Sequence, residues 1–71
     1  MRLIKAKQSG KDRVIYINVD KISMFYSDIY DGKYITKIYL PERIEVDGNH
    51  ADEIEHFIAE YSSGLYDLTE E

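Results

Sequence analysis

The chain has 71 residues, of which 44% are hydrophobic and 32% are charged. This length and composition predict one small globular domain and argue against a disordered chain. The absence of cysteine excludes a disulfide framework and a cysteine-based zinc site, and the apolar runs are too short for a membrane-spanning helix. Because residues 1–5 lack the apolar stretch of a signal peptide, we expect a cytoplasmic protein with no membrane association.

The charged side chains are divided unevenly along the chain. Residues 1–43 contain all nine Lys and Arg with five acids, whereas residues 44–71 contain nine acids and no Lys or Arg. One interpretation is internal compensation, in which an acidic helix lies near a basic sheet. The other is an acidic surface presented to a basic partner, such as a nucleic-acid-binding protein.

Strand patterns fill the first two thirds of the chain. Stretches rich in β-branched and aromatic residues, separated by turn residues, predict strands over residues 2–8, 13–19, 22–28 and 34–40, with a short fifth strand over 43–46. Residues 9–12 form the first predicted turn. Asp31-Gly32 predicts a tight hairpin turn between the third and fourth strands, and Pro41 ends the fourth.

Helical periodicity replaces this alternation after residue 49. One apolar stripe predicts a helix over residues 50–63, and its members are Ala51, Ile54, Phe57, Ile58 and Tyr61. Asn49 is the expected N-cap, and Gly64 is the expected stop signal.

These elements predict an α+β fold, in which a small antiparallel sheet of four to five strands has one C-terminal helix packed on one face. We expect residues 1–64 to form this single domain and residues 65–71 to form an acidic C-terminal tail. The alternative is that the tail docks on the sheet through Leu65, Tyr66 and Leu68.

Alternation assigns each apolar strand residue to one face of the predicted sheet. The core face is expected to contain Ile15, Ile17, Val19, Ile22, Met24, Ile38, Leu40, Ile44 and Val46. The opposite face then exposes Val14, Tyr16, Phe25, Ile35 and Tyr39. Contiguous apolar patches rich in tyrosine are typical of interaction sites.

No pattern in the sequence predicts catalysis, so we expect a protein that is not an enzyme and has no catalytic residues. His50 and His56 are six residues apart and do not share a helix face. Asp52, His56 and Glu60 do share one, which we interpret as a solvated helix surface, and we therefore predict neither a metal site nor a cofactor. The scattered Lys and Arg residues argue against direct nucleic-acid binding.

Two segments carry a family resemblance. Residues 16–22, Tyr-Ile-Asn-Val-Asp-Lys-Ile, and residues 36–40, Thr-Lys-Ile-Tyr-Leu, followed by Ile44-Glu45-Val46, Asn49 and Glu53-Ile54, resemble small FlbD-like flagellar-operon proteins. A similar succession occurs in the LytTR DNA-binding domain, which is longer and has a basic surface that this chain lacks. The resemblance implies a β-meander with one helix, in a small accessory or regulatory protein of bacteria or phages.

The leading hypothesis is a small non-enzymatic interaction module that regulates or inhibits a protein partner. The expected partner-binding residues are Tyr16, Phe25, Ile35 and Tyr39 on the open sheet face, and Asp52, Glu53, Glu55 and Glu60 on the helix. A narrower version is an acidic phage- or mobile-element-encoded decoy for a basic nucleic-acid-binding site. The alternatives are a homodimer or larger homo-oligomer with a structural role, and a reduced LytTR-like DNA-binding module.

Overall fold

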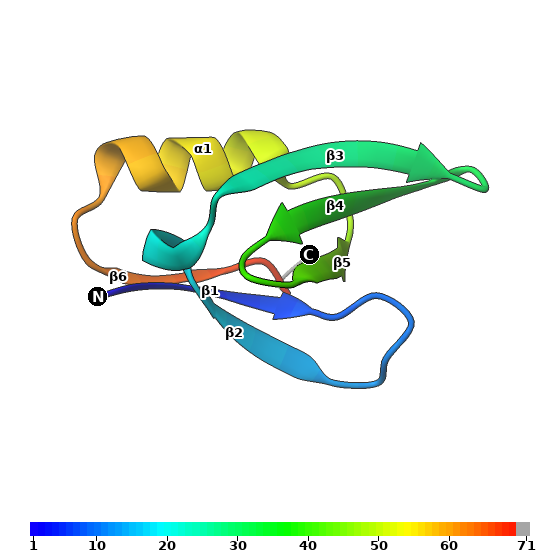
Figure 1. Cartoon of the computed structure of the whole chain (residues 1–71), viewed down its shortest axis with the longest axis horizontal. Coiled ribbons are helices and arrows are strands. Elements are labelled where there is room, and N and C mark those ends of the chain that lie inside the picture. The colour runs from blue at the N-terminus through cyan, green and yellow to red at the C-terminus, as the bar shows by residue number, and fades with distance from the viewer. Residues whose placement is uncertain (70–71) are drawn as a thin grey trace.

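The computed structural model describes residues 1–69 and has the predicted α+β class, with one helix in the C-terminal part of the chain (Figure 1). In chain order its elements are β1 (Arg2–Lys7), β2 (Val14–Asn18), the 3₁₀ helix η1 (Val19–Lys21), β3 (Met24–Tyr30), β4 (Lys33–Tyr39), β5 (Arg43–Asp47), α1 (Ala51–Glu60) and β6 (Gly64–Asp67). Within this part of the chain, no helix is long and apolar enough to cross a membrane.

The strands form two three-stranded sheets instead of the single sheet of four to five strands that the sequence suggested. β1 pairs antiparallel with β2 and parallel with β6, while β3, β4 and β5 form an antiparallel meander. The chain passes between the sheets at η1, where the Asn18 side chain accepts a hydrogen bond from the Asp20 N–H. The sheets meet again at one corner, where Ser9 N–H donates to the Glu45 carbonyl.

Strand β3 begins two residues later than predicted, and its two sides are assigned the other way round. Phe25 pairs with Ile38 and packs against the core, whereas Met24 is 52% exposed. Since successive side chains of a strand point to opposite faces, Tyr26 takes the outward position. The placement of Phe25 on the open face, and of Met24 in the core, is therefore wrong.

Helix α1 is shorter at both ends than predicted. His50, not Asn49, precedes its first turn, and the His50 side chain makes no capping hydrogen bond. Hydroxyl groups of the neighbouring strands replace a cap, because His50 N–H donates to Thr36 Oγ1 and Ala51 N–H donates to Ser27 Oγ. The helix ends at Glu60, since Tyr61 adopts an extended conformation, so Gly64 does not end it.

The chain after the helix returns to the first sheet instead of forming a tail from residue 65. β6 runs parallel to β1, Leu68 is buried, and the Tyr66 ring stacks on Phe57 with centroids 5.4 Å apart. The folded unit therefore continues past residue 64, as the docking alternative predicted for Tyr66 and Leu68, whereas Leu65 is 54% exposed. Residues 70–71 of the expected tail lie outside the described residues.

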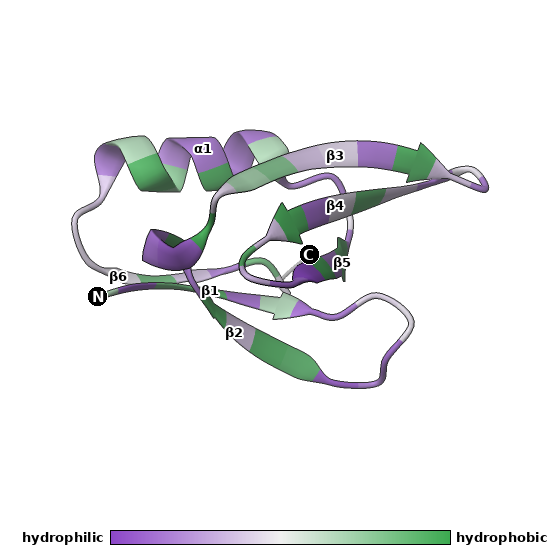
Figure 2. Cartoon of the chain, viewed as in Figure 1, coloured by the Kyte–Doolittle hydropathy of each residue, from purple (hydrophilic) through white to green (hydrophobic). Residues whose placement is uncertain are grey.

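One core lies between the two sheets and the helix. Every layer contributes to it, and its buried apolar side chains are Ile4, Ala6, Ile17, Val19, Ile38, Val46, Ile54, Phe57 and Leu68. Along α1, hydrophobic and hydrophilic segments alternate around the ribbon, as expected for a helix with one buried side (Figure 2). This arrangement leaves the outer faces of both sheets and the outer side of α1 free to meet other molecules.

Candidate interaction surfaces

The outer face of the β3–β4–β5 sheet carries several aromatic side chains. By strand alternation this surface, here called the tyrosine face, comprises Met24, Tyr26, Asp28, Tyr30, Lys33, Ile35, Lys37, Tyr39, Arg43, Glu45 and Asp47. The rings of Tyr26 and Tyr39 are stacked, with centroids 6.1 Å apart and planes 8° from parallel. Lys37 Nζ lies 5.9 Å from the Tyr26 centroid, close enough for a cation–π contact.

The two stacked tyrosines differ in their electrostatic surroundings. The hydroxyl contact with Tyr26, together with the Arg43 guanidinium, lowers the pKa of Tyr39 below its usual value of 10.0. The same hydroxyl contact raises the pKa of Tyr26. Either hydroxyl can donate across the 3.4 Å that separates the two oxygens.

The charges of the tyrosine face are balanced. Three cations, Lys33, Lys37 and Arg43, lie among three carboxylates, Asp28, Glu45 and Asp47. Lys37 pairs with Asp28 at 3.6 Å, and Arg43 pairs with Glu45 at 3.5 Å. Stacking platforms for nucleic acids need excess positive charge along the backbone path, so this face does not have the electrostatics of one.

The outer side of α1 carries the other predicted binding residues, Asp52, Glu53, Glu55 and Glu60, and all four are exposed. At 100° per residue they lie within an arc of about 160°, opposite the buried Ile54 and Phe57. We call this surface the acidic helix face. It places the carboxylates together as the sequence predicted.

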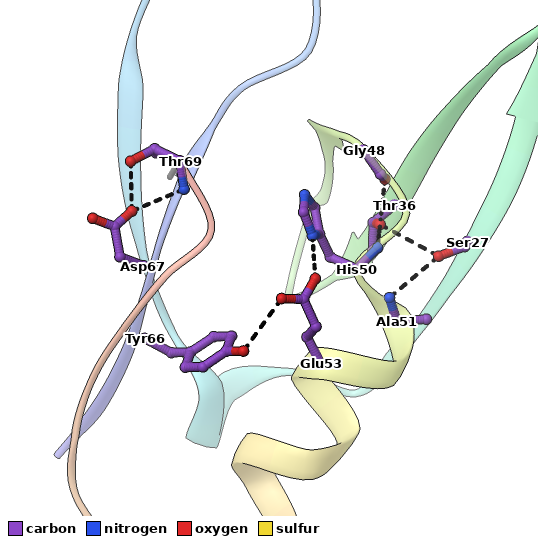
Figure 3. A network of polar contacts seen from close by, with 9 residues as sticks. All are labelled: Ser27, Thr36, Gly48, His50, Ala51, Glu53, Tyr66, Asp67 and Thr69. Atoms are coloured by element: carbon purple, nitrogen blue, oxygen red, sulfur yellow. Dashed lines mark hydrogen bonds and ion pairs between the residues drawn. The ribbon is translucent and has the colours of Figure 1, made fainter. Parts of the chain in front are cut away.

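One of these carboxylates is held by its neighbours. Glu53 Oε1 lies 2.6 Å from His50 Nδ1, and Glu53 Oε2 accepts a hydrogen bond from the Tyr66 hydroxyl at 3.2 Å (Figure 3). Burial, followed by the negative charge of Glu53, raises the pKa of Tyr66 and keeps its hydroxyl a donor. Glu53 thus ties the start of α1 to β6 and is a structural residue as well as a surface one.

The other three helix carboxylates make no ion pair within the part of the chain that the structure describes. Among residues 1–69, no Lys or Arg side chain lies within ion-pair distance of Asp52, Glu55 or Glu60. The paired cations of the sheets instead meet acids outside the helix: Arg2 with Asp20, Lys5 with Asp67, Lys37 with Asp28, and Arg43 with Glu45. Direct pairing between an acidic helix and a basic sheet therefore does not compensate the charge division along the chain.

A buried polar cluster fixes the connection from β5 to α1. Thr36 Oγ1 donates to the Gly48 carbonyl at 2.8 Å and accepts from the His50 N–H at 2.8 Å (Figure 3). Gly48 has φ +100°, and a Cβ there would overlap the His50 ring. These groups satisfy one another, and no group of three or more metal-ligating side chains gathers within residues 1–69. The cluster therefore positions the start of the helix.

A solvent-open groove of about 560 Å³ lies between β2 and the β4–β5 connection. Its apolar wall consists of Ile15 and Ile17 from β2, with Leu40 and Ile44 opposite them. Arg13, Lys21 and Arg43 supply its cations. This β2 groove was not predicted, because its two sides come from different sheets.

The four residues expected to share one open sheet face are divided. Ile35 and Tyr39 lie on the tyrosine face, Tyr16 lies on β2 of the other sheet and is 59% exposed, and Phe25 packs against the core. Sequence reasoning missed Tyr26 as a member of this face. The Asp31-Gly32 turn could have identified it, because the turn fixes which residues pair across the hairpin.

Comparison of the chain with protein-family models, curated proteins and solved structures finds no match. Function must therefore be argued from the three surfaces themselves.

Proposed function

We propose that this protein is a small non-enzymatic interaction module that binds a basic protein partner through the acidic helix face and thereby regulates or inhibits it. The supporting observation is that Asp52, Glu55 and Glu60 have no counter-ion among residues 1–69. Clustered carboxylates without counter-ions create a local negative potential that accelerates encounter with a basic surface and disfavours acidic ones.

The narrower form of this proposal is a decoy, encoded by a phage or mobile element, that occupies a basic nucleic-acid-binding site. Such a site attracts phosphates mainly by charge, so a rigid row of carboxylates competes for the same Lys and Arg side chains. Helix α1 is suited to this role because Ile54 and Phe57 anchor it on the core and leave its acidic side outward.

The test compares two variants with equal change in net charge. Asp52→Asn/Glu55→Gln/Glu60→Gln neutralises the acidic helix face, and Asp12→Asn/Asp31→Asn/Asp47→Asn neutralises three exposed acids elsewhere. Each tagged protein is used to capture partners from a nuclease-treated host lysate. We expect wild type and the second variant to recover the same basic protein and the helix variant to lose it.

Two outcomes contradict the proposal. Recovery of the same partner by the helix variant shows that the acidic helix face does not bind it. Recovery of untagged copies of the chain alone favours the second candidate, a homo-oligomer with a structural role. That candidate is supported by the tyrosine face, where aromatic rings and balanced charges suit contact between identical surfaces.

A further inference from the structure

Strand β2 ends its sheet with an unprotected edge. It is the outer strand in the order β2-β1-β6, so one of its edges has no strand neighbour among residues 1–69. Its sequence, Val-Ile-Tyr-Ile-Asn, contains no charged residue and no proline. The other end strands all contain charges: Asp28 in β3, Arg43, Glu45 and Asp47 in β5, and Asp67 in β6. Proteins usually block free edges with charge, because a bare edge recruits further strands.

The β2 groove follows this strand, because four consecutive residues of β2, Ile15 to Asn18, line it. Ile15 lies on one side, and Leu40 and Ile44 lie on the other; all three are partly exposed, whereas Ile17 is only 2% exposed. Side chains of an extended segment alternate every residue, so a segment paired with β2 places every second side chain beside Ile15, Leu40 and Ile44. The main-chain N–H and C=O groups of the segment meanwhile form hydrogen bonds with those on the free edge of β2.

The charges around the groove select the chemistry of that segment. Arg13 and Lys21 line the groove and make no ion pair within residues 1–69, and the one acid among the lining residues is Glu42, although the whole chain has a net charge of −5. Arg43 also lines the groove, but it is paired with Glu45. Arg13 is oriented by a hydrogen bond from its Nε to Gln8 Oε1 at 2.7 Å. A local excess of positive charge on an acidic protein favours an acidic occupant.

A second copy of the chain fits this edge poorly. Antiparallel pairing of two β2 strands about Tyr16 places Lys11 of one copy opposite Lys21 of the other, and Asp12 opposite Asp20, at both ends of the paired strands. Like charges across neighbouring strands are unfavourable. These like charges therefore oppose self-pairing at β2.

We propose that the β2 groove binds an extended acidic segment of a partner protein by strand addition to β2. The apolar side chains of that segment enter the groove beside Ile15, Leu40 and Ile44, and its acidic side chains lie at the groove's rim beside the exposed Arg13 and Lys21. The inference goes beyond the proposed function, since it uses a different surface and involves none of the acidic helix carboxylates.

The experiment uses the full chain and a pool of peptides of about nine residues that alternate Asp or Glu with Val, Ile or Leu. A matched pool carries Lys or Arg in place of the acids. Binding is measured by fluorescence anisotropy, and amide hydrogen exchange is followed by NMR. We expect the acidic pool alone to bind and to slow the exchange of amides in residues 14–18.

Charge variants then locate the binding site. Arg13→Glu/Lys21→Glu reverses two groove cations, and Lys7→Glu/Lys33→Glu reverses two exposed lysines that do not line the groove. The first variant is expected to lower the affinity for the acidic peptides roughly tenfold more than the second variant does. The neutralised helix variant described above should bind the pool as wild type does, which separates this site from the acidic helix face.

Three results overturn the inference. The first is absence of binding by the acidic pool, or equal binding of the basic pool. The second is slowed exchange confined to residues outside β2. The third is β2 protection that rises with protein concentration without peptide, which would assign the edge to a second copy.

Discussion

Arg2 Nη1 donates a hydrogen bond to the carbonyl oxygen of Ile58 over 2.8 Å, joining the beginning of β1 to the last turn of α1. The last carbonyls of a helix have no partner within it, and α1 has no basic residue in its own last turn. Arg2 supplies both the donor and the favourable positive charge from a distant strand. Arg2 Nη2 pairs with Asp20 Oδ1 at 2.7 Å, so the same side chain also contacts η1.

Arg2→Met is expected to lower the free energy of unfolding by about 1–3 kcal/mol, because charge-assisted hydrogen bonds to the helix end are lost. Asp20→Asn is the matched control, since it removes the ion pair and keeps the helix contact. The Asp20 side chain is 55% exposed, so Asp20→Asn should lower the free energy of unfolding by less than about 1 kcal/mol. Urea unfolding of the three proteins measures both effects. Equal losses in the two variants would show that the ion pair, not the helix end, carries the stabilisation.

The segment after α1 offers two leucines with opposite environments. Leu68 is 5% exposed in the core, whereas Leu65 on β6 is 54% exposed. Leu68→Ala should lower the free energy of unfolding by about 2–5 kcal/mol through lost burial and a residual cavity. Leu65→Ala should change it by no more than about 0.5 kcal/mol. If chemical denaturation gives two similar small values, the C-terminal segment is not part of the cooperative fold.

Most element ranges could be predicted because their signals are local. Alternation, turn residues and the change to helical periodicity are readable within a few residues, and the observed β1, β2, β4 and β5 lie within one residue of their predicted ends. The correct face of Phe25 could also have been predicted from neighbouring residues. Asp31 and Gly32 both have positive φ, 54° and 78°, as in a two-residue type I′ turn. Counting outward from that turn pairs Phe25 with Ile38, so Phe25 shares its core face.

The division into two sheets could not be predicted, because it depends on contacts between distant segments. β6 is only four residues long and pairs with β1 from the other end of the chain. Such a strand is too short to show alternation, and its four residues do not indicate which strand it pairs with. The β2 groove has the same origin, since Ile15 and Ile44 come from different sheets. The acidic helix face was predictable because one helix supplies all of it.

Asp67 is expected to make the fold sensitive to acid. The hydroxyl and the main-chain N–H of Thr69 donate to it, and these contacts, with Lys5 at 3.9 Å, lower the pKa of Asp67 below 3.8. A carboxyl with a lowered folded-state pKa adds stability above its unfolded pKa. That stability is lost as the pH falls through the folded value. The difference in unfolding free energy between wild type and Asp67→Asn should therefore be constant above about pH 5 and shrink below pH 3.8.

Urea unfolding across this pH range provides the measurement. Thr69→Val removes the hydroxyl donor and keeps the main-chain donor, so its acid dependence should lie between those of wild type and Asp67→Asn. A difference between wild type and Asp67→Asn that stays constant through the acid range would show that Asp67 has the same affinity for protons in the folded and unfolded chains.

The two sides of β3 give the last prediction. Phe25→Ser removes a ring packed against the core and should lower the free energy of unfolding by about 3–5 kcal/mol, or less in proportion to its partial exposure. Tyr26→Ser/Tyr39→Ser removes a stack on the outer face, where Tyr39 is partly buried, and should lower the free energy of unfolding by a smaller amount, about 1–2 kcal/mol. The homo-oligomer candidate further predicts that this double variant is a monomer under conditions where wild type is a dimer. Light scattering coupled to size-exclusion chromatography measures the mass of each. A dimer that persists without the two rings would exclude the tyrosine face as its interface, and a monomeric wild type would exclude the candidate.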